Sequence, residues 1–541
     1  MYADLHCHSF LRPFERTDIT ANPPVMSGNP CDDTSVWHLA REAGDLVDIE
    51  HKLGFIGYTE SAFSQVAGNN GAVMVVSLFA VENGFFELRK SLMSAILSRL
   101  GMKKLLEQFL GMVISKFNIT NIKIVQMNLF TYKEVLEKQI NFMVKGQFTT
   151  VNLATCNQAD YAGLQGKGYE LIKPGKASLP ANSSIKVLWS IEGGNCLWSK
   201  VQLTAADMWD GRNFEEKAGL KEAAAKYNPL PQFGNDYRRH ITINAIKNKE
   251  LVQLIPWKVC DQLVANVAEL KNLECRPFFI TVGHHFYNGL VGHPASLQPL
   301  TDLKLLDQSF GWNSDITNAG WCVINEMLRE PGKRILVDVK HMCIKSRQSY
   351  YEFRRNNYPD VPVIFSHGSV YAASLKNGIY TSNADIIPSP DGMAPNFYHH
   401  DVNLFDEDIM EITQSRGLIG IEFDQRINGV KGEHPDHIMP EMIWHNMRYI
   451  AEVAAGYLHD GQSVWDVLSL GTDFDGIINP MSKCQTASMI NDLRSYIKGF
   501  LSGYLGTPNP LAYADNAMDI ETVLDKIFFK NIVDFAAKYY V

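Results

Sequence analysis

The segment Pro362-Val363-Ile364-Phe365-Ser366-His367 is a short apolar run that ends in a side chain able to bind a metal ion. The same arrangement recurs in four other segments, which are spread over nearly the whole chain. They are Asp4-Leu5-His6-Cys7-His8, Ile191-Glu192-Gly193-Gly194, Val337-Asp338-Val339-Lys340-His341 and Leu470-Gly471-Thr472-Asp473-Phe474-Asp475-Gly476. The strands of a parallel barrel all end at one rim, so side chains at those ends can converge on one point. The five segments therefore predict a parallel barrel with a metal site at its C-terminal face.

Eight apolar runs are expected to form the strands of this barrel. They lie near residues 2–7, 72–80, 186–191, 277–283, 334–340, 361–366, 417–423 and 466–471. Continuous apolar character over such lengths suits a parallel sheet that is buried on both faces. Helical patterns lie between several runs: one is capped by Ser314 or Asp315 and stops at Pro331-Gly332, and another covers Glu441 to Ala455. The alternation predicts an α/β fold, a (β/α)8 TIM barrel, as a single catalytic domain over residues 1–541.

Three long connections are expected to decorate the barrel, at about 83–150, 195–275 and 371–402, because each is longer than a usual connection between a strand and its helix. The first contains an amphipathic pattern from Leu92 to Leu110, which indicates added helices. The third is rich in Pro, Asn and Gly and is expected to form an extended loop over the barrel mouth. The C-terminal tail, 477–541, is predicted to end in a helix from Ile520 to Tyr540.

The composition is that of an ordinary globular protein, with 46% hydrophobic and 20% charged residues in a chain of 541. A net charge of -9 and the lack of a basic run exclude nucleic acid as the expected partner. A small-molecule substrate is expected instead, and homo-oligomerisation is left open. The nine cysteines are odd in number and include no Cys-x-x-Cys pair, which favours reduced thiols over a disulfide framework.

No membrane span is expected, because the longest apolar stretch, 72–81, is about half of the ~20 residues needed to cross a bilayer. The first candidate ligand, His6, lies too near Met1 for a secretory leader to precede the core. These two observations favour a cytoplasmic location.

The candidate metal ligands have distinct expected roles. His6 and His8 lie two residues apart, so they point to the same face of a strand and can bind one ion. Glu192 is a carboxylate at a strand end, where burial is costly without a partner, and its two oxygens could bridge two cations. His341 and His367 end neighbouring runs and together could bind a second ion.

Other polar residues are candidates for chemistry or for shaping loops. Asp473 is expected to accept a proton from water, whereas Asp475 is expected to be structural. His284 and His285 both follow an apolar run, and spacing alone does not decide which one contacts the substrate. Asn288 is expected to hold their loop, and His399-His400-Asp401 is expected to be a solvated loop cluster.

With these residues in view, the chain resembles the renal (membrane) dipeptidase family of binuclear zinc peptidases, which is related to the amidohydrolases. The likeness runs from residue 4 to about residue 535 and is interrupted by the insertions. The segments that carry it include Ile191-Glu192-Gly193-Gly194, Ile316-Thr317-Asn318-Ala319-Gly320, Val337-Asp338-Val339-Lys340-His341, Ile364-Phe365-Ser366-His367-Gly368-Ser369 and Gly471-Thr472-Asp473-Phe474-Asp475-Gly476. The resemblance implies a TIM barrel of the metal-dependent hydrolase type.

The resemblance also implies two divalent metal ions, Zn2+ in that family, with Glu192 bridging them. His6 and His8 would hold one ion, and His341 and His367 the other. Asp473 would handle protons and His284 would contact the substrate. The implied reaction is the attack of a hydroxide bridging the two ions on an amide bond of a dipeptide-like substrate.

Two departures from the family's pattern matter most for the expected site. His8 stands where the family usually has Asp, which raises the net charge of the site by one. Val402 stands where the family has the arginine that binds the substrate carboxylate, ahead of Asn403-Leu404, and Val cannot pair with a carboxylate. Arg416, Arg426 or a residue of 371–402 could take over, and the sequence selects none of them.

Three other functions remain open. The His-x-His opening is usual for amidohydrolases that act on cyclic amides, lactones or esters. The opening Asp4-Leu5-His6-Cys7-His8-Ser9 also resembles metal-dependent phosphoesterases, although Thr59-Glu60-Ser61 lacks the histidine that they carry next. A non-catalytic protein that keeps the metal site is the third alternative.

Overall fold

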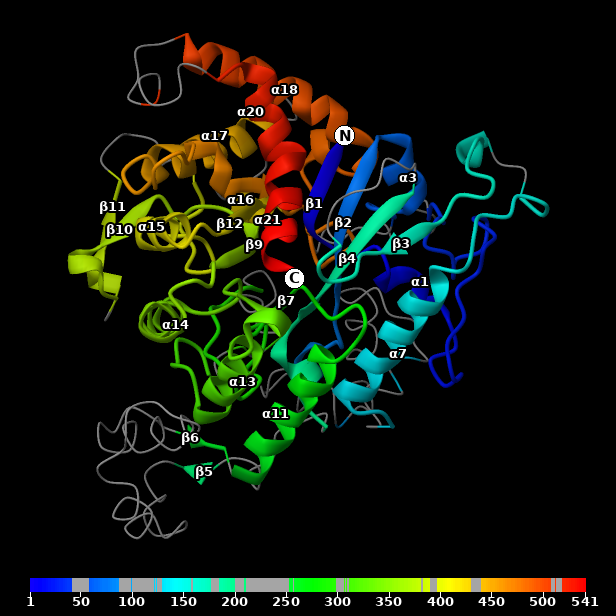
Figure 1. Cartoon of the computed structure of the whole chain (residues 1–541), viewed down its shortest axis with the longest axis horizontal. Helices are drawn as coiled ribbons and strands as arrows, with labels where there is room; N and C mark the ends of the chain where they lie inside the picture. Colours follow the sequence, from blue (N-terminus) through cyan, green and yellow to red (C-terminus); the bar gives the residue numbers. More distant parts are fainter. Residues whose placement is uncertain are drawn as a thin grey trace.

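The computed structural model describes residues 1–40, 58–86, 129–156, 159–176, 184–199, 257–297, 311–380, 397–429, 439–506 and 518–541, with shorter pieces at 209–210, 253–255 and 383–389 and the single residues 99, 121, 123, 306, 308 and 511. Eight parallel strands follow one another around a barrel (Figure 1). They are β1 (Tyr2–Cys7), β2 (Gly71–Leu78), β4 (Ile185–Glu192), β7 (Phe279–Thr281), β8 (Leu336–Asp338), β9 (Ile364–Gly368), β12 (Leu418–Ile421) and β13 (Leu468–Leu470).

Each strand coincides with one of the eight expected runs, so the predicted (β/α)8 TIM barrel is confirmed. The strands are largely buried, as expected from their apolar sequences. In β4, for example, all eight residues are buried. The barrel closes between its first and last strands near their carboxyl ends, where the backbone N–H of His8 donates to the carbonyl of Phe474 at 2.7 Å. A ninth strand, β3 (Tyr169–Leu171), extends the sheet beside β4.

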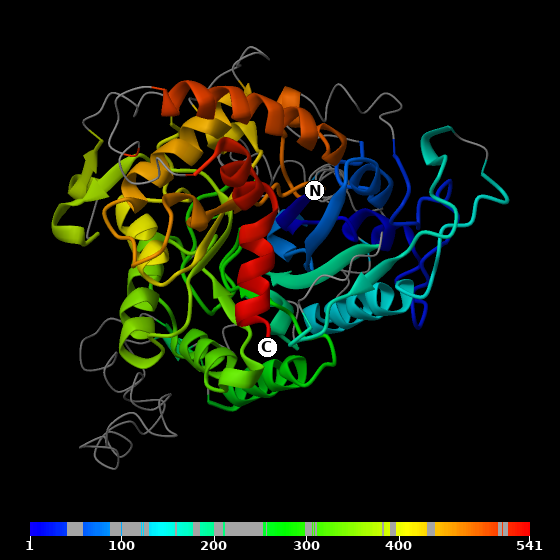
Figure 2. The ribbon, with the colours of Figure 1, turned by 45° about the horizontal axis from the view of Figure 1, so that its top comes forward.

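Helices surround the barrel, most of them on its outside, while short α16 lies at its mouth (Figures 1 and 2). They are α1 (Leu11–Arg16), α3 (Phe63–Gly68), α7 (Tyr132–Gly146), α11 (Trp257–Lys271), α13 (Asn318–Leu328), α14 (Ile344–Asn357), α15 (Asp406–Gln414), α16 (Gln425–Asn428), α17 (Met439–Ala454), α18 (Ile490–Leu505), α20 (Ile520–Asp525) and α21 (Asn531–Tyr539). Among the described residues, no helix is both long enough and apolar enough to cross a membrane.

The C-terminal helix lies at the amino ends of the strands, opposite the rim at which the candidate ligands lie. Phe278, which immediately precedes β7, packs edge-on against Phe535 and Tyr540 of this region. The expected single helix is interrupted by a π-helical turn, Lys526–Lys530. Just after that turn, the amide of Asn531 donates to the carbonyls of Trp465 and Leu468 at 2.6 and 2.8 Å, which fixes the helix beneath β13.

Several expectations about connections need correction. The helix after residue 314 is capped by Thr317, whose hydroxyl accepts from the N–H of Gly320 at 3.0 Å, and not by Ser314 or Asp315. The 371–402 connection is not only a loop, because β10 (Ala373–Leu375) and β11 (Ile386–Pro388) pair within it as an antiparallel hairpin. The pattern Leu92–Leu110 lies almost entirely outside the described residues, while α7 and α11 lie in the first and second insertions.

The expectation of reduced thiols is wrong at one pair of cysteines. Cys31 and Cys156 form a disulfide, with their Cα atoms 5.8 Å apart. It joins the segment after α1 to the region before β3, which are 125 residues apart in sequence. The other seven cysteines are free, and six of them are buried.

Glycine at position 420 is required by close packing between barrel strands, because a Cβ there would lie 1.9 Å from the carbonyl oxygen of Ser366. We expect Gly420→Ala to lower the free energy of unfolding by about 1–3 kcal/mol, as overpacking does. Gly499→Ala is the matched control, since nothing lies within 4 Å of a Cβ at that helical position. Alanine there should be neutral or stabilising by up to about 1 kcal/mol. Urea denaturation of both variants measures the difference, and equal stabilities would contradict this account.

Candidate metal centre

The end of β1 supplies two imidazoles. His6 and His8 are 0% and 1% exposed, and their Nε2 atoms lie 3.2 Å apart. Because residues two apart in a strand share a face, both rings point into the barrel mouth, as the sequence predicted. Asp4 fixes this strand end: its carboxylate accepts the N–H of Thr472 at 3.0 Å and the hydroxyl of Thr472 at 2.6 Å.

Glu192, the last residue of β4, lies at the centre of the site. Its Oε2 is 2.9 Å from Nε2 of His8, and its Oε1 is 3.6 Å from Nε2 of His6. Its Oε1 is also 3.4 Å from Nε2 of His341 and 3.5 Å from Nε2 of His367. One carboxylate therefore contacts both pairs of histidines that the sequence singled out. The chain turns sharply after it, since Gly193 has a φ of +89°.

The other two imidazoles follow β8 and end β9. His341 has a φ of +62°, in the left-handed region that non-glycine residues seldom adopt. His367 is oriented by a contact of 2.9 Å between its Nδ1 and the hydroxyl of Ser366. That hydroxyl donates in turn to Asp338 at 2.5 Å, so a buried carboxylate behind the site fixes the ring.

The two aspartates after β13 have different surroundings. Oδ1 of Asp473 lies 3.5 Å from Nε2 of His6 and 3.3 Å from Nε2 of His8. Asp475 points elsewhere: its carboxylate accepts the N–H groups of Glu60 and Ser61 at 3.0 and 2.9 Å. Asp473 thus lies at the cluster, and Asp475 holds a neighbouring loop, which is the structural position expected for it.

His284 and His285 both line the mouth but have different partners. His284 contacts Oε2 of Glu82 through Nδ1 at 2.8 Å and lies 3.6 Å from Glu192 through Nε2. His285 contacts the hydroxyl of Ser296 through Nδ1 at 2.7 Å. His284 is therefore the histidine held against the central carboxylate.

Two further candidates from the sequence lie outside the cluster. Asn288 holds the His284 loop as expected, because its amide donates to the carbonyl of Val282 at 2.6 Å. The His399–Asp401 group does not line the mouth. It is not wholly solvated either, since His400 is only 7% exposed and lies 3.2 Å from Asp401.

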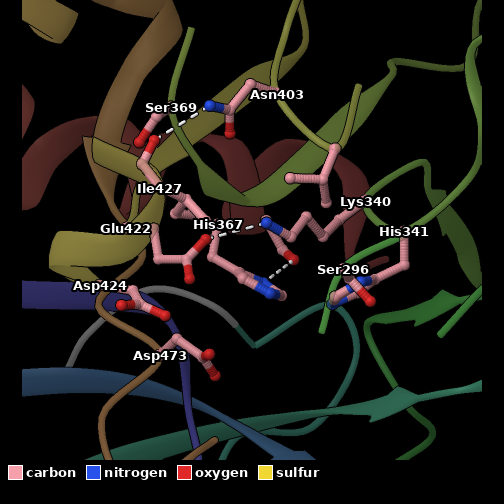
Figure 3. Close-up of polar contacts among 12 residues, drawn as sticks. Ser296, Lys340, His341, His367, Ser369, Asn403, Glu422, Asp424, Ile427 and Asp473 are labelled. Carbon is pink, nitrogen blue, oxygen red and sulfur yellow. Dashed lines mark hydrogen bonds and ion pairs between the residues drawn. The ribbon is translucent and has the colours of Figure 1, made fainter. Parts of the chain in front are cut away.

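Sequence reasoning missed three charged residues that line the mouth, Lys340, Glu422 and Asp424, and it missed Glu82, which holds His284. Lys340 and Glu422 form a buried ion pair, with Nζ 2.8 Å from Oε2 (Figure 3). Glu82 and Glu422 both end apolar runs, so the rule that identified Glu192 could have found them. Neither glutamate is followed by a pair of glycines such as the one after Glu192, and the pattern Glu422-Phe423-Asp424 was overlooked.

The buried histidines and carboxylates of the cluster have pKa values that are shifted in different directions, and a bound cation would neutralise the carboxylates. Burial lowers the pKa of His8, but the carboxylates of Asp473 and Glu192 outweigh it and raise the pKa to about 10. Burial lowers the pKa of His341 to about 3. Burial raises the pKa of Glu192, yet the imidazoles of His284 and His6 prevail and hold it well below its usual range. The carboxylates therefore attract positive charge, and His341 does not supply it by binding a proton.

The donor atoms around Glu192 form groups that could hold a metal ion. One group of ligand atoms comes from His6, His8, Glu192 and Asp473, and another from Glu192, His341 and His367. Within each group the atoms lie within 4.8 Å of one another, and Glu192 belongs to both. Oδ1 of Asp473 is buried and has no hydrogen-bond partner among the described residues. Imidazole and carboxylate ligands suit Zn2+ and related divalent ions.

A pocket of about 520 Å3, which includes space open to solvent, lies against this cluster. Its wall combines the polar residues described above with apolar side chains. The apolar members are Phe79, Leu297, Val402, Ile427 and Ile477. The pocket is therefore suited to a small molecule with both polar and apolar parts.

Comparison with known proteins gives matches among solved structures only, since no protein-family model and no curated protein sequence matches the chain. A metallo peptidase from Rhodobacter sphaeroides, liganded with a phosphinate mimic of L-Ala-D-Ala, has 10% identity and a TM-score of 0.45, with 99% of each chain covered. The metallo peptidase dipeptidase AC has 11% identity and a TM-score of 0.44, with 100% of this chain and 99% of that chain covered. The probable dipeptidase PvdM from Pseudomonas aeruginosa has 8% identity and a TM-score of 0.40, with 98% of this chain and 96% of that chain covered. At such low values, function has to be inferred from the site itself.

The variant His341→Ala tests whether His341 is one of the metal ligands. We expect His341→Ala to weaken metal binding by roughly tenfold or more, because it removes a nitrogen donor from the second group. Exposed His459 provides the matched control, and His459→Ala should bind metal as the parent chain does. Metal content is measured by elemental analysis after dialysis against a weak chelator. Equal metal content in the two variants would remove His341 from the ligand set.

Proposed function

We propose that this chain is a binuclear metal-dependent hydrolase that cleaves an amide bond in a dipeptide-like substrate. The observation that carries the proposal is the position of Glu192, a single buried carboxylate in contact with two pairs of histidines. A carboxylate in this position can bridge two cations. A structural site for a single ion has its own complete set of ligands, so it does not require a carboxylate that is shared with a second ion.

In this proposal His6 and His8 hold one Zn2+ ion and His341 and His367 hold the other, with Glu192 between them. Two such ions supply Lewis acidity, which polarises a carbonyl group and makes water a nucleophile near neutral pH. The protein side chains provide the remaining functions, which are proton transfer and orientation of the substrate.

Asp473 is the proposed proton carrier. Its Oδ1 has no hydrogen-bond partner among the described residues, and it faces the cluster from the end of β13. The carboxylate would accept a proton from the attacking water and return it to the nitrogen of the leaving amine. This single transfer gives an amine and a carboxylic acid, and the acid then ionises to a carboxylate by losing the second proton of the water to solvent or to the amine.

His284 is the proposed contact to the substrate. Its Nδ1 is held by Glu82 at 2.8 Å, which leaves Nε2 directed towards the cluster. Burial lowers the pKa of His284, but the charges of Glu82 and Glu192 outweigh it and raise the pKa. The imidazolium can donate from Nδ1 to Glu82 and from Nε2 to the oxygen of the scissile carbonyl while negative charge develops on it. Glu82 acts as a positioning residue, because its carboxylate fixes the ring and favours the protonated imidazole.

A second candidate is hydrolysis of a cyclic amide, lactone or ester. Val402 favours it, since this residue lines the pocket where the resembled family has a carboxylate-binding arginine. A phosphoesterase is less well supported. Glu60, in the segment where those enzymes carry a metal-binding histidine, is committed to the N–H of Asp475 at 2.7 Å.

Asp473→Asn separates proton transfer from metal binding. The amide has nearly the shape of the carboxylate but cannot accept a proton from water at neutral pH. We expect metal content to be retained and kcat to fall by roughly 100- to 10,000-fold, the usual contribution of a general base. Steady-state kinetics and metal analysis on the same preparation measure both. Full turnover in the metal-loaded variant would show that another group transfers the proton.

Removal and return of metal test the function as a whole. Protein treated with a chelator should lose hydrolysis of dipeptides, tested with L,L, L,D and D-containing pairs, and added Zn2+ should restore it. Hydantoins, lactones and simple esters form the comparison panel. Metal-dependent turnover of rings or esters with none on dipeptides would favour the second candidate. Stable metal binding with turnover of no member of the panel would indicate a binding protein.

A further inference from the structure

Lys340 reaches into the pocket from the residue before His341, where the resembled motif has serine. It is 1% exposed, and its Nζ lies 2.8 Å from Oε2 of Glu422. Figure 3 shows the ammonium extended towards Glu422 and beside His367, with Asp473 in the same cavity. A buried ammonium requires both a counter-charge and acceptors for its protons.

The ammonium of Lys340 is only partly satisfied. It has three N–H donors, and across the described ranges its one hydrogen-bond partner is Glu422. The ring of Phe365, 5.6 Å away, provides a cation–π contact without an acceptor oxygen. Two N–H groups therefore remain for something else that occupies the pocket.

Arg426, the other Lys or Arg side chain among the described residues lining the pocket, is already committed. Its guanidinium meets both oxygens of Asp424 at 2.6–2.9 Å and donates to the carbonyl of Ile477 at 2.5 Å. Asp424 also caps α16 by accepting the N–H of Arg426. This pair therefore shapes the loop, and Arg416, the other arginine that the sequence suggested, is exposed and does not line the pocket.

We propose that Lys340 binds the carboxylate of the substrate through the donors that Glu422 does not use. The inference rests on the proposed function and names its substrate class: amides of amino acids that keep a free carboxylate near the scissile bond. A carboxylate offers two oxygens to the two remaining N–H groups, and a charge-assisted hydrogen bond in a buried site is strong. Glu422 is then a positioning residue that holds the ammonium in the pocket.

Binding of two small probes tests this directly. The metal-loaded protein is titrated calorimetrically with N-acetylglycine and with N-acetylglycinamide, which differ in the carboxylate alone. We expect the acid to bind roughly 10- to 100-fold more tightly, the range for hydrogen bonds to a charged group. Lys340→Met should remove this preference and Lys340→Arg should restore part of it. Lys345→Met, the same change at an exposed site on α14, should leave the preference intact.

Glu422→Gln gives an independent test that keeps Lys340 and all proposed ligands. Because the neutral amide no longer neutralises the ammonium, we expect the acid to bind several-fold more tightly and the amide probe to be unaffected. Equal binding of the two probes by the parent protein, or a preference that survives in Lys340→Met, would overturn the proposal. So would unchanged binding of the acid by Glu422→Gln.

The same measurements distinguish failure of this inference from failure of the proposed function. Metal-dependent hydrolysis of neutral and acidic amides at equal kcat/KM, with no binding preference, would leave the function standing and exclude Lys340 as the carboxylate site. A clear preference for the acid with no hydrolysis of any amide would leave the Lys340 site standing and exclude amide hydrolysis as the function.

Discussion

The seam at which the barrel closes is the constraint on which the site depends. The backbone N–H of Asp473 donates to the carbonyl of His6 at 2.9 Å, and the N–H of His8 donates to the carbonyl of Phe474 at 2.7 Å. Two proposed ligands and the proposed proton carrier are thus placed by the bonds that join the first strand to the last. The first metal group can form only when residues more than 460 positions apart have paired, so the fold and the site are completed together.

Buried aspartates fix both halves of the site from behind. Asp4 joins β1 to Thr472, which follows β13. Asp338, at the end of β8, joins that strand to β7 and β9. Asp338 accepts the hydroxyls of Thr281 and Ser366 at 2.5 Å each and the N–H of Lys340 at 3.1 Å. Because these carboxylates are fully engaged, the ligands beside them are held by a rigid frame, which is what preorganised binding of metal and substrate requires.

The strands and most of the cluster could be predicted because they follow one local rule, an apolar run ended by a ligand. Glu192 stood out through the glycines after it, whereas Glu82 and Glu422 obey the rule without such neighbours. The Cys31–Cys156 disulfide could not be inferred, since 125 residues separate the partners and only the fold brings them together. The choice between His284 and His285 likewise needed Glu82, which approaches His284 from another strand end.

The departures from the resembled motifs compensate one another in charge. An imidazole at His8 in place of a carboxylate makes the mouth more positive by one charge, and Val402 in place of arginine makes it more negative by one. Lys340 in place of serine adds a positive charge that Glu422 balances at 2.8 Å. The changes at His8 and Val402 therefore cancel, and Lys340, paired with Glu422, supplies a cation beside His341. A substrate carboxylate bound there would lie next to the second metal group, so the scissile bond and the anchor would be set by adjacent residues of one strand end.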